Sequence, residues 1–88
     1  VVHTDFNCLS VIQYAVDVLE IKDIIVTGHY GCGGIRAAYE HTKLGLIDNW
    51  LRHIQDVADK YHDRIKKVSS EEAKLRCLCE LNVVEQVH

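Results

Sequence analysis

Apolar residues recur along the chain at different spacings, and each spacing predicts a different kind of element. Between residues 8 and 20 they return every three or four positions, which is typical of a helix with one apolar stripe. Asp5 or Asn7 is placed to cap the N-terminus of this helix. Further apolar residues widen the stripe, so we expect the helix to be covered on two sides. These residues are Leu9, Tyr14 and Val16.

A continuous apolar run, Ile24 to Thr27, follows the first helix. Because the run is unbroken rather than alternating, it predicts a strand that is buried on both faces, as in a parallel sheet. The run leads into a glycine-rich turn over residues 28–34 and then into a short helix over residues 35–41. This order of helix, buried strand, turn and helix predicts an α/β fold with helices that flank one central strand.

Two further helices are predicted in the second half of the chain. A long helix over residues 46–66 has an apolar stripe, and a last helix opens with Ser69 and Glu72, which match a capping box. The stripe of the long helix is Ile47, Trp50, Leu51, Ile54, Val57, Ala58, Tyr61 and Ile65. The stripe of the last helix is Ala73, Cys77, Leu81, Val84 and His88, broadened by Leu78 and Val87.

The single predicted strand requires a partner. A lone buried strand leaves its backbone N–H and C=O groups unpaired, which a protein interior does not tolerate. We therefore expect the partner strands to come from sequence outside these residues, from another chain, or from Val1 and Val2. Methionine is absent even at position 1, which also favours a longer polypeptide. Residues 1–88 are accordingly interpreted as one partial domain.

Composition and charge exclude several classes of protein. The 88 residues fit at most one small domain, and 48% hydrophobic against 26% charged residues is typical of a globular protein. A net charge of −3 and a pI near 6.0 exclude the basic surface of a nucleic-acid-binding protein. No apolar run approaches the roughly 18 residues of a membrane span, and no signal peptide is visible. The four unevenly spaced cysteines then predict free thiols and a cytoplasmic location.

The candidate chemistry lies in His29-Tyr30-Gly31-Cys32, directly after the predicted strand. Imidazole nitrogen and thiolate sulfur are both good zinc ligands, and two intervening residues allow them to converge on one ion. Gly31 allows the turn a positive φ, and the carboxyl end of a parallel strand is where α/β sheets bind ligands. The alternatives are a chance spacing in a plain tight turn, or a nucleotide loop. The turn matches neither G-x-G-x-x-G nor the P-loop.

Other cysteines and histidines have simpler interpretations. Cys77 and Cys79 are two residues apart on a predicted helix, so they point to different sides and are interpreted as core and surface thiols. Cys8 lies on an apolar stripe and is expected to pack rather than to bind a metal. His53 and His62 are nine residues apart, too far to share an ion without a third element.

Several segments together resemble the β-class carbonic anhydrases, in particular their bacterial branch. The resemblance covers nearly the whole chain and is highly specific. It is carried by residues 3–11 (HTDFNCLSV), 13–16 (QYAV), 25–35 (IVTGHYGCGGI), 44–51 (LGLIDNWL) and 80–87 (ELNVVEQV).

The resemblance implies a central parallel sheet, a zinc ion, and a homodimer or an assembly of dimers. It implies that zinc is held by two cysteines and one histidine, with His29 and Cys32 as the second and third ligands. Tyr14 corresponds to a tyrosine near the active-site cleft, and Gly33 to the backbone turn beside the metal. The implied reaction is the reversible hydration of carbon dioxide to bicarbonate and a proton.

The sequence also departs from the family pattern. The first zinc cysteine of the family belongs to a Cys-x-Asp-x-Arg motif upstream of the matching segments, and its aspartate and arginine orient the metal-bound solvent. The motif does not occur in these residues, so we expect the isolated chain to hydrate carbon dioxide poorly. Cys8 or His3 is a weak substitute for the third ligand. The alternative to a carbonic anhydrase is a non-catalytic truncated paralogue or an oligomerising fragment.

Overall fold

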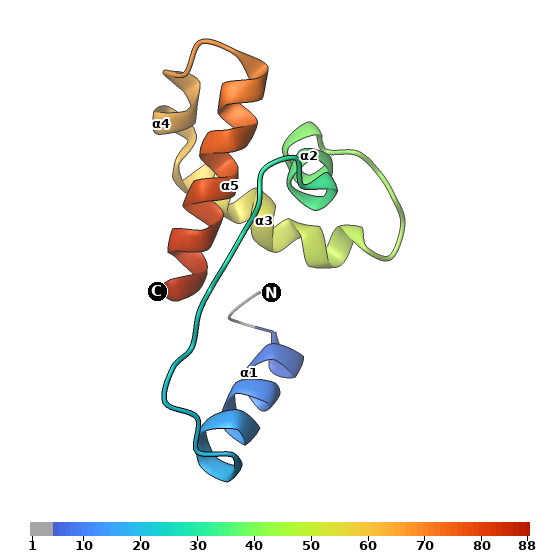
Figure 1. Ribbon diagram of the computed structural model, residues 1–88. Coiled ribbons are helices and arrows are strands. Elements are labelled where there is room, and N and C mark those ends of the chain that lie inside the picture. Colours follow the sequence, from blue (N-terminus) through green and yellow to red (C-terminus); the bar gives the residue numbers. More distant parts are fainter. Residues whose placement is uncertain (1–4) are drawn as a thin grey trace.

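A computed structural model describes residues 5–88 of the chain (Figure 1), so His3, Val1 and Val2 lie outside the described residues. The described residues form a set of helices joined by loops. The elements in chain order are α1 (Phe6–Gln13), the π-helical turn η1 (Tyr14–Val18), α2 (Gly33–Glu40), α3 (Asp48–Lys60), α4 (His62–Lys66) and α5 (Glu71–Val87).

The first predicted helix is present as α1 continued by η1. Asp5 caps it as predicted, because its side chain accepts a hydrogen bond from the Asn7 backbone N–H at 3.2 Å. The prediction that the helix is covered on two sides is wrong for the described residues, because α1 and η1 contact each other and no other helix. Phe6 is 84% exposed, and neither α1 nor η1 contains a buried residue.

The expected strand over Ile24 to Thr27 is not formed between residues 5 and 88. The segment runs instead as a long extended coil from the end of η1 to α2, beside α1 in Figure 1. Ile25 is 83% exposed. The physical reason is the one that the sequence raised: a strand needs a neighbour to pair its backbone groups, and no other described segment offers one.

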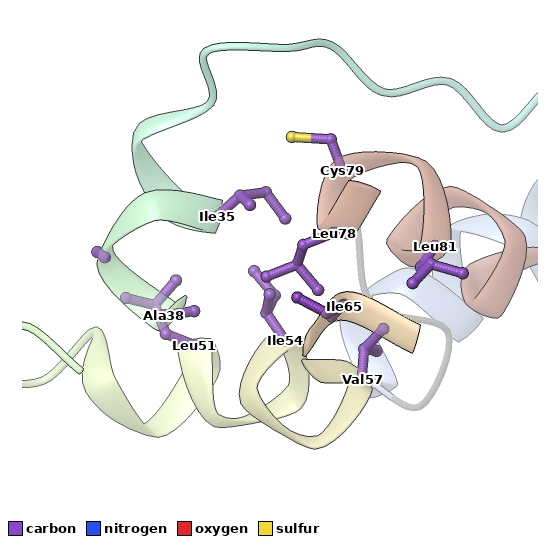
Figure 2. Packing of buried hydrophobic residues seen from close by; sticks show 10 residues of the cluster. Ile35, Ala38, Leu51, Ile54, Val57, Ile65, Leu78, Cys79 and Leu81 are labelled. Atoms are coloured by element: carbon purple, nitrogen blue, oxygen red, sulfur yellow. The ribbon is translucent and has the colours of Figure 1, made fainter. Parts of the chain in front are cut away.

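The hydrophobic core lies where α2, α3, α4 and α5 pack together (Figure 2). Leu51 of α3 and Leu78 of α5 are its largest fully buried side chains. The predicted stripe of the long helix supplies much of this core. The buried residues are Ile35, Ala37, Ala38, Leu51, Ile54, Val57, Ile65, Leu78, Cys79 and Leu81.

The structure corrects several details in the second half of the chain. The predicted helix over residues 46–66 is broken at Tyr61, whose φ of −107° and ψ of 23° separate α3 from α4. The last helix is capped by Ser70, one residue later than predicted, and the Ser70 hydroxyl accepts from the Ala73 N–H at 3.1 Å. Tyr61 packs against the core as expected, whereas Trp50 is 39% exposed and lies outside the core cluster.

No helix between residues 5 and 88 combines the length and the apolar character that crossing a membrane requires.

Truncation of the core should destabilise the protein far more than truncation of an exposed leucine. We expect Leu51→Ala to lower the free energy of unfolding by about 2–5 kcal/mol, because it leaves a cavity among buried side chains. Leu46→Ala is the matched control, since Leu46 is 88% exposed, and it should change stability by less than about 0.5 kcal/mol. Urea unfolding followed by circular dichroism measures both values. Equal losses would contradict the assignment of the core.

Candidate functional site

The glycine loop, residues 28–32, connects the extended coil to α2. Its sharp turn depends on Gly31, whose φ of +69° lies in the left-handed region, as the sequence predicted. At its other end Gly28 lies against α5, because a Cβ built on Gly28 would be 2.5 Å from Cγ2 of Val83. The loop is therefore shaped by its glycines and seated on α5.

His29 is exposed in this loop, and one of its ring nitrogens is already engaged. Nδ1 lies 2.9 Å from the backbone carbonyl oxygen of Tyr30. A carbonyl oxygen can only accept a hydrogen bond, so this contact assigns the proton to Nδ1, and in the neutral imidazole the lone pair is then on Nε2. This is the arrangement of a histidine that is ready to bind a metal through Nε2.

Cys32 occupies the N-cap position of α2 and is partly buried. It packs against the core, and its carbonyl oxygen accepts from the Arg36 N–H at 3.1 Å, which starts the helix. Cys79 of α5 lies beside it. Burial raises the pKa of the Cys79 thiol, an effect that the neighbouring Cys32 N–H partly offsets.

Helix α5 also contacts Tyr30, one of the two residues between the candidate ligands. The Tyr30 hydroxyl donates a 2.5 Å hydrogen bond to Oε1 of Glu80, and the guanidinium of Arg76 lies 5.3 Å from the centre of the Tyr30 ring. The hydrogen bond to Glu80 and the negative charge of that carboxylate raise the pKa of Tyr30. Sequence reasoning missed Glu80 and Arg76, since no local pattern relates them to a tyrosine some fifty residues away.

The structure brings together only part of the predicted site. His29 and Cys32 line two different hollows, which share Cys79 of α5, so their convergence on one ion remains a prediction. No cluster of three metal-binding side chains occurs within residues 5–88. Gly33 begins α2 with open space at its Cα. Tyr14 lies on η1, which does not contact α2 in the described part of the chain.

Cys79 lies beside the glycine loop, whereas Cys8, Cys77, His53 and His62 line neither of its two hollows. Cys79 is buried and Cys77 is half-buried against the core, so neither is the surface thiol that the sequence predicted. Cys8 does not pack into a core as predicted, and it lines an open hollow between α1 and the extended coil. His53 is half-buried on α3, and His62 is exposed.

Comparison with known protein families gives a match over the whole chain. The family described as "Carbonic anhydrase" matches residues 1–88. A carbonic anhydrase of Emericella nidulans is 42% identical over 81 residues, which are 92% of this chain and 36% of that protein. A carbonic anhydrase of Candida albicans is 36% identical over 85 residues, which are 94% of this chain and 30% of that protein.

The comparisons do not support the bacterial branch in particular. A carbonic anhydrase of Pseudomonas aeruginosa is 33% identical over 79 residues, covering 86% of this chain and 35% of that protein. The two fungal relatives are thus more similar to this chain than the bacterial one is. The chain spans about a third of the length of these relatives.

The contact of Gly28 with α5 gives a testable consequence. Gly28→Ala places a methyl group against Val83 at 2.5 Å, so the loop or the helix must shift, and we expect lower stability. Overpacking of this kind typically costs about 1–3 kcal/mol. Thermal unfolding of Gly28→Ala, alone and combined with Val83→Ala, measures the cost and its relief.

Gly33→Ala is the control, because a Cβ at Gly33 meets no atom within 4 Å. It should leave the unfolding temperature unchanged or raise it slightly, since alanine favours a helix over glycine. A Gly28→Ala variant as stable as wild type would show that the loop is not seated on α5.

Proposed function

Since this chain belongs to the carbonic anhydrase family, we propose that the protein of which it is part catalyses the reversible hydration of carbon dioxide to bicarbonate and a proton. The observation that carries the proposal is the family match over residues 1–88, which includes the glycine loop with both candidate ligands. Two relatives that match over 92% and 94% of the chain are carbonic anhydrases by name.

We propose that His29 and Cys32 are two of the protein's zinc ligands. The donor set fits this metal, because imidazole nitrogen and thiolate sulfur are ligands that zinc prefers. Nδ1–H of His29 donates a hydrogen bond to the Tyr30 carbonyl oxygen, so Nε2 is the ring nitrogen that can bind the metal. When bound, zinc acidifies water so that a hydroxide nucleophile is available near neutral pH.

The start of α2 suits the anionic side of the reaction. The first backbone N–H groups of a helix have no partner within the helix and favour a negative charge. Gly33 adds no side chain there, so a small anion can approach the backbone closely. We propose that Gly33 borders the bicarbonate site, and that Tyr14 approaches it in the complete protein.

The complete protein also has to satisfy the backbone of Ile24 to Thr27. We propose that this segment becomes a central strand of a parallel sheet, because its apolar, β-branched side chains suit burial on both faces. A homodimer or a dimer of dimers accords with the exposed apolar residues of α1 and η1. The four free thiols accord with a reducing location such as the cytoplasm.

The test is zinc content and carbon dioxide hydration in the full-length protein. We expect His29→Ala and Cys32→Ser each to lose most of the bound zinc and at least about a hundredfold in kcat/KM, because a catalytic zinc site depends on each of its few protein ligands. Elemental analysis measures the zinc, and stopped-flow mixing with a pH indicator measures the hydration.

His62→Ala is the matched control, since His62 is an exposed histidine outside the glycine loop. It should keep the zinc content and the rate of the wild type. A full-length protein that binds zinc but hydrates carbon dioxide no faster than buffer would overturn the proposed activity. Full zinc occupancy in both loop variants would overturn the ligand assignment.

A further inference from the structure

We propose that Glu80 and Arg76 of α5 are positioning residues for the zinc ligand His29, and that they act through Tyr30. This inference rests on the proposed function, because it concerns how the protein holds a metal ligand. It identifies two residues of the last helix that no motif in the glycine loop indicates.

The connection runs through a single residue. The side chain of Tyr30 is tied to α5 by its hydroxyl, which donates to Oε1 of Glu80. The backbone carbonyl oxygen of Tyr30 accepts from Nδ1–H of His29 at 2.9 Å. The position of α5 is thus transmitted through Tyr30 to the imidazole ring, which leaves the ring little freedom to turn while the hydrogen bond is kept.

Alternate residues of the glycine loop all meet the same helix. Gly28 lies against Val83, Tyr30 binds Glu80, and Cys32 lies beside Cys79. The turn at Tyr30 and Gly31 bends the loop along α5, so one helix contacts all three residues. The Gly28 contact is packing and the Cys32 contact involves its backbone N–H, whereas Tyr30 with Glu80 is a hydrogen bond between two side chains.

The contact of Tyr30 with Glu80 is suited to orienting the His29 ring and contributes little to the stability of the fold. A hydroxyl that donates to a carboxylate forms a short and directional bond. Arg76 stands over the ring at 5.3 Å, so the ring is held by a cation as well. All three side chains are exposed, and exposed charged contacts contribute little to global stability. Loss of the contact should therefore change zinc binding without unfolding the protein.

The experiment compares Tyr30→Phe with wild type in the full-length protein. The probe is zinc itself, titrated against a chromophoric chelator. We expect Tyr30→Phe to weaken zinc binding by less than the about tenfold that loss of a direct hydrogen-bonding partner of a metal ligand costs, because the Tyr30 carbonyl still accepts from His29. Cobalt(II) substitution is the second readout, because the intensity and position of its visible bands report ligand geometry and should change in the variant.

Variants of Glu80 separate positioning from a general structural effect. Glu80→Ala should weaken zinc binding as much as Tyr30→Phe does, and the double variant should be no worse than either, because both changes remove one contact. Glu80→Gln keeps an acceptor for the hydroxyl and should restore most of the affinity. Arg76→Ala removes only the contact with the ring and should have a smaller effect.

The matched control is Tyr61→Phe. The Tyr61 hydroxyl also donates to a glutamate of α5, Glu85, at 3.2 Å, but Tyr61 is not part of the glycine loop. Tyr61→Phe should keep the zinc affinity and the cobalt spectrum of the wild type. Equal zinc affinity in wild type and Tyr30→Phe would overturn the positioning role and leave the proposed function standing. A full-length wild type that binds no zinc would overturn both.

Discussion

Burial of Leu78 against α2 and α3 is the interaction on which the position of the glycine loop depends. Leu78 is completely buried, and Leu51 and Ile54 of α3 belong to the same cluster (Figure 2). Burying one such side chain contributes about 1.5–3 kcal/mol, so the orientation of α5 is fixed by its core face. The residues that meet the loop lie close to Leu78 on the same helix. The glycine loop contributes little to the core, so its position is determined by its contacts with α5, which is distant in sequence.

The sequence predicted well those features that a local pattern determines. The apolar stripe of the long helix identified Leu51, Ile54 and Val57, which are buried, because burial of one helix face repeats with the period of the helix. Asp5 was one of two residues predicted as the cap, with Asn7, and Gly31 was predicted to have a positive φ, since both follow from local backbone requirements. The resemblance to carbonic anhydrases agrees with the family match, although not in its branch.

Other features escaped because they depend on contacts between distant residues. The break at Tyr61 carries no glycine or proline that would mark it, and Ser70 rather than Ser69 became the cap although the two are adjacent serines. The contact between Tyr30 and Glu80 joins two surface residues that no periodicity relates. The predicted strand over residues 24–27 failed for a different reason. Its pattern was read correctly as unbroken and apolar, but a pattern cannot supply the neighbour that a ladder of hydrogen bonds requires.

The extended coil before the glycine loop has a consequence for how this piece of the protein behaves in solution. Residues 24–27 are β-branched and carry no charge, and all of them except Val26 are exposed, which is typical of segments that template intermolecular sheets. Lys22 and Asp23 precede the run directly, and charges at such flanks oppose self-association of hydrophobic strands. During synthesis this stretch emerges before α5, so Lys22 and Asp23 flank it before the helix on which the glycine loop rests has been made.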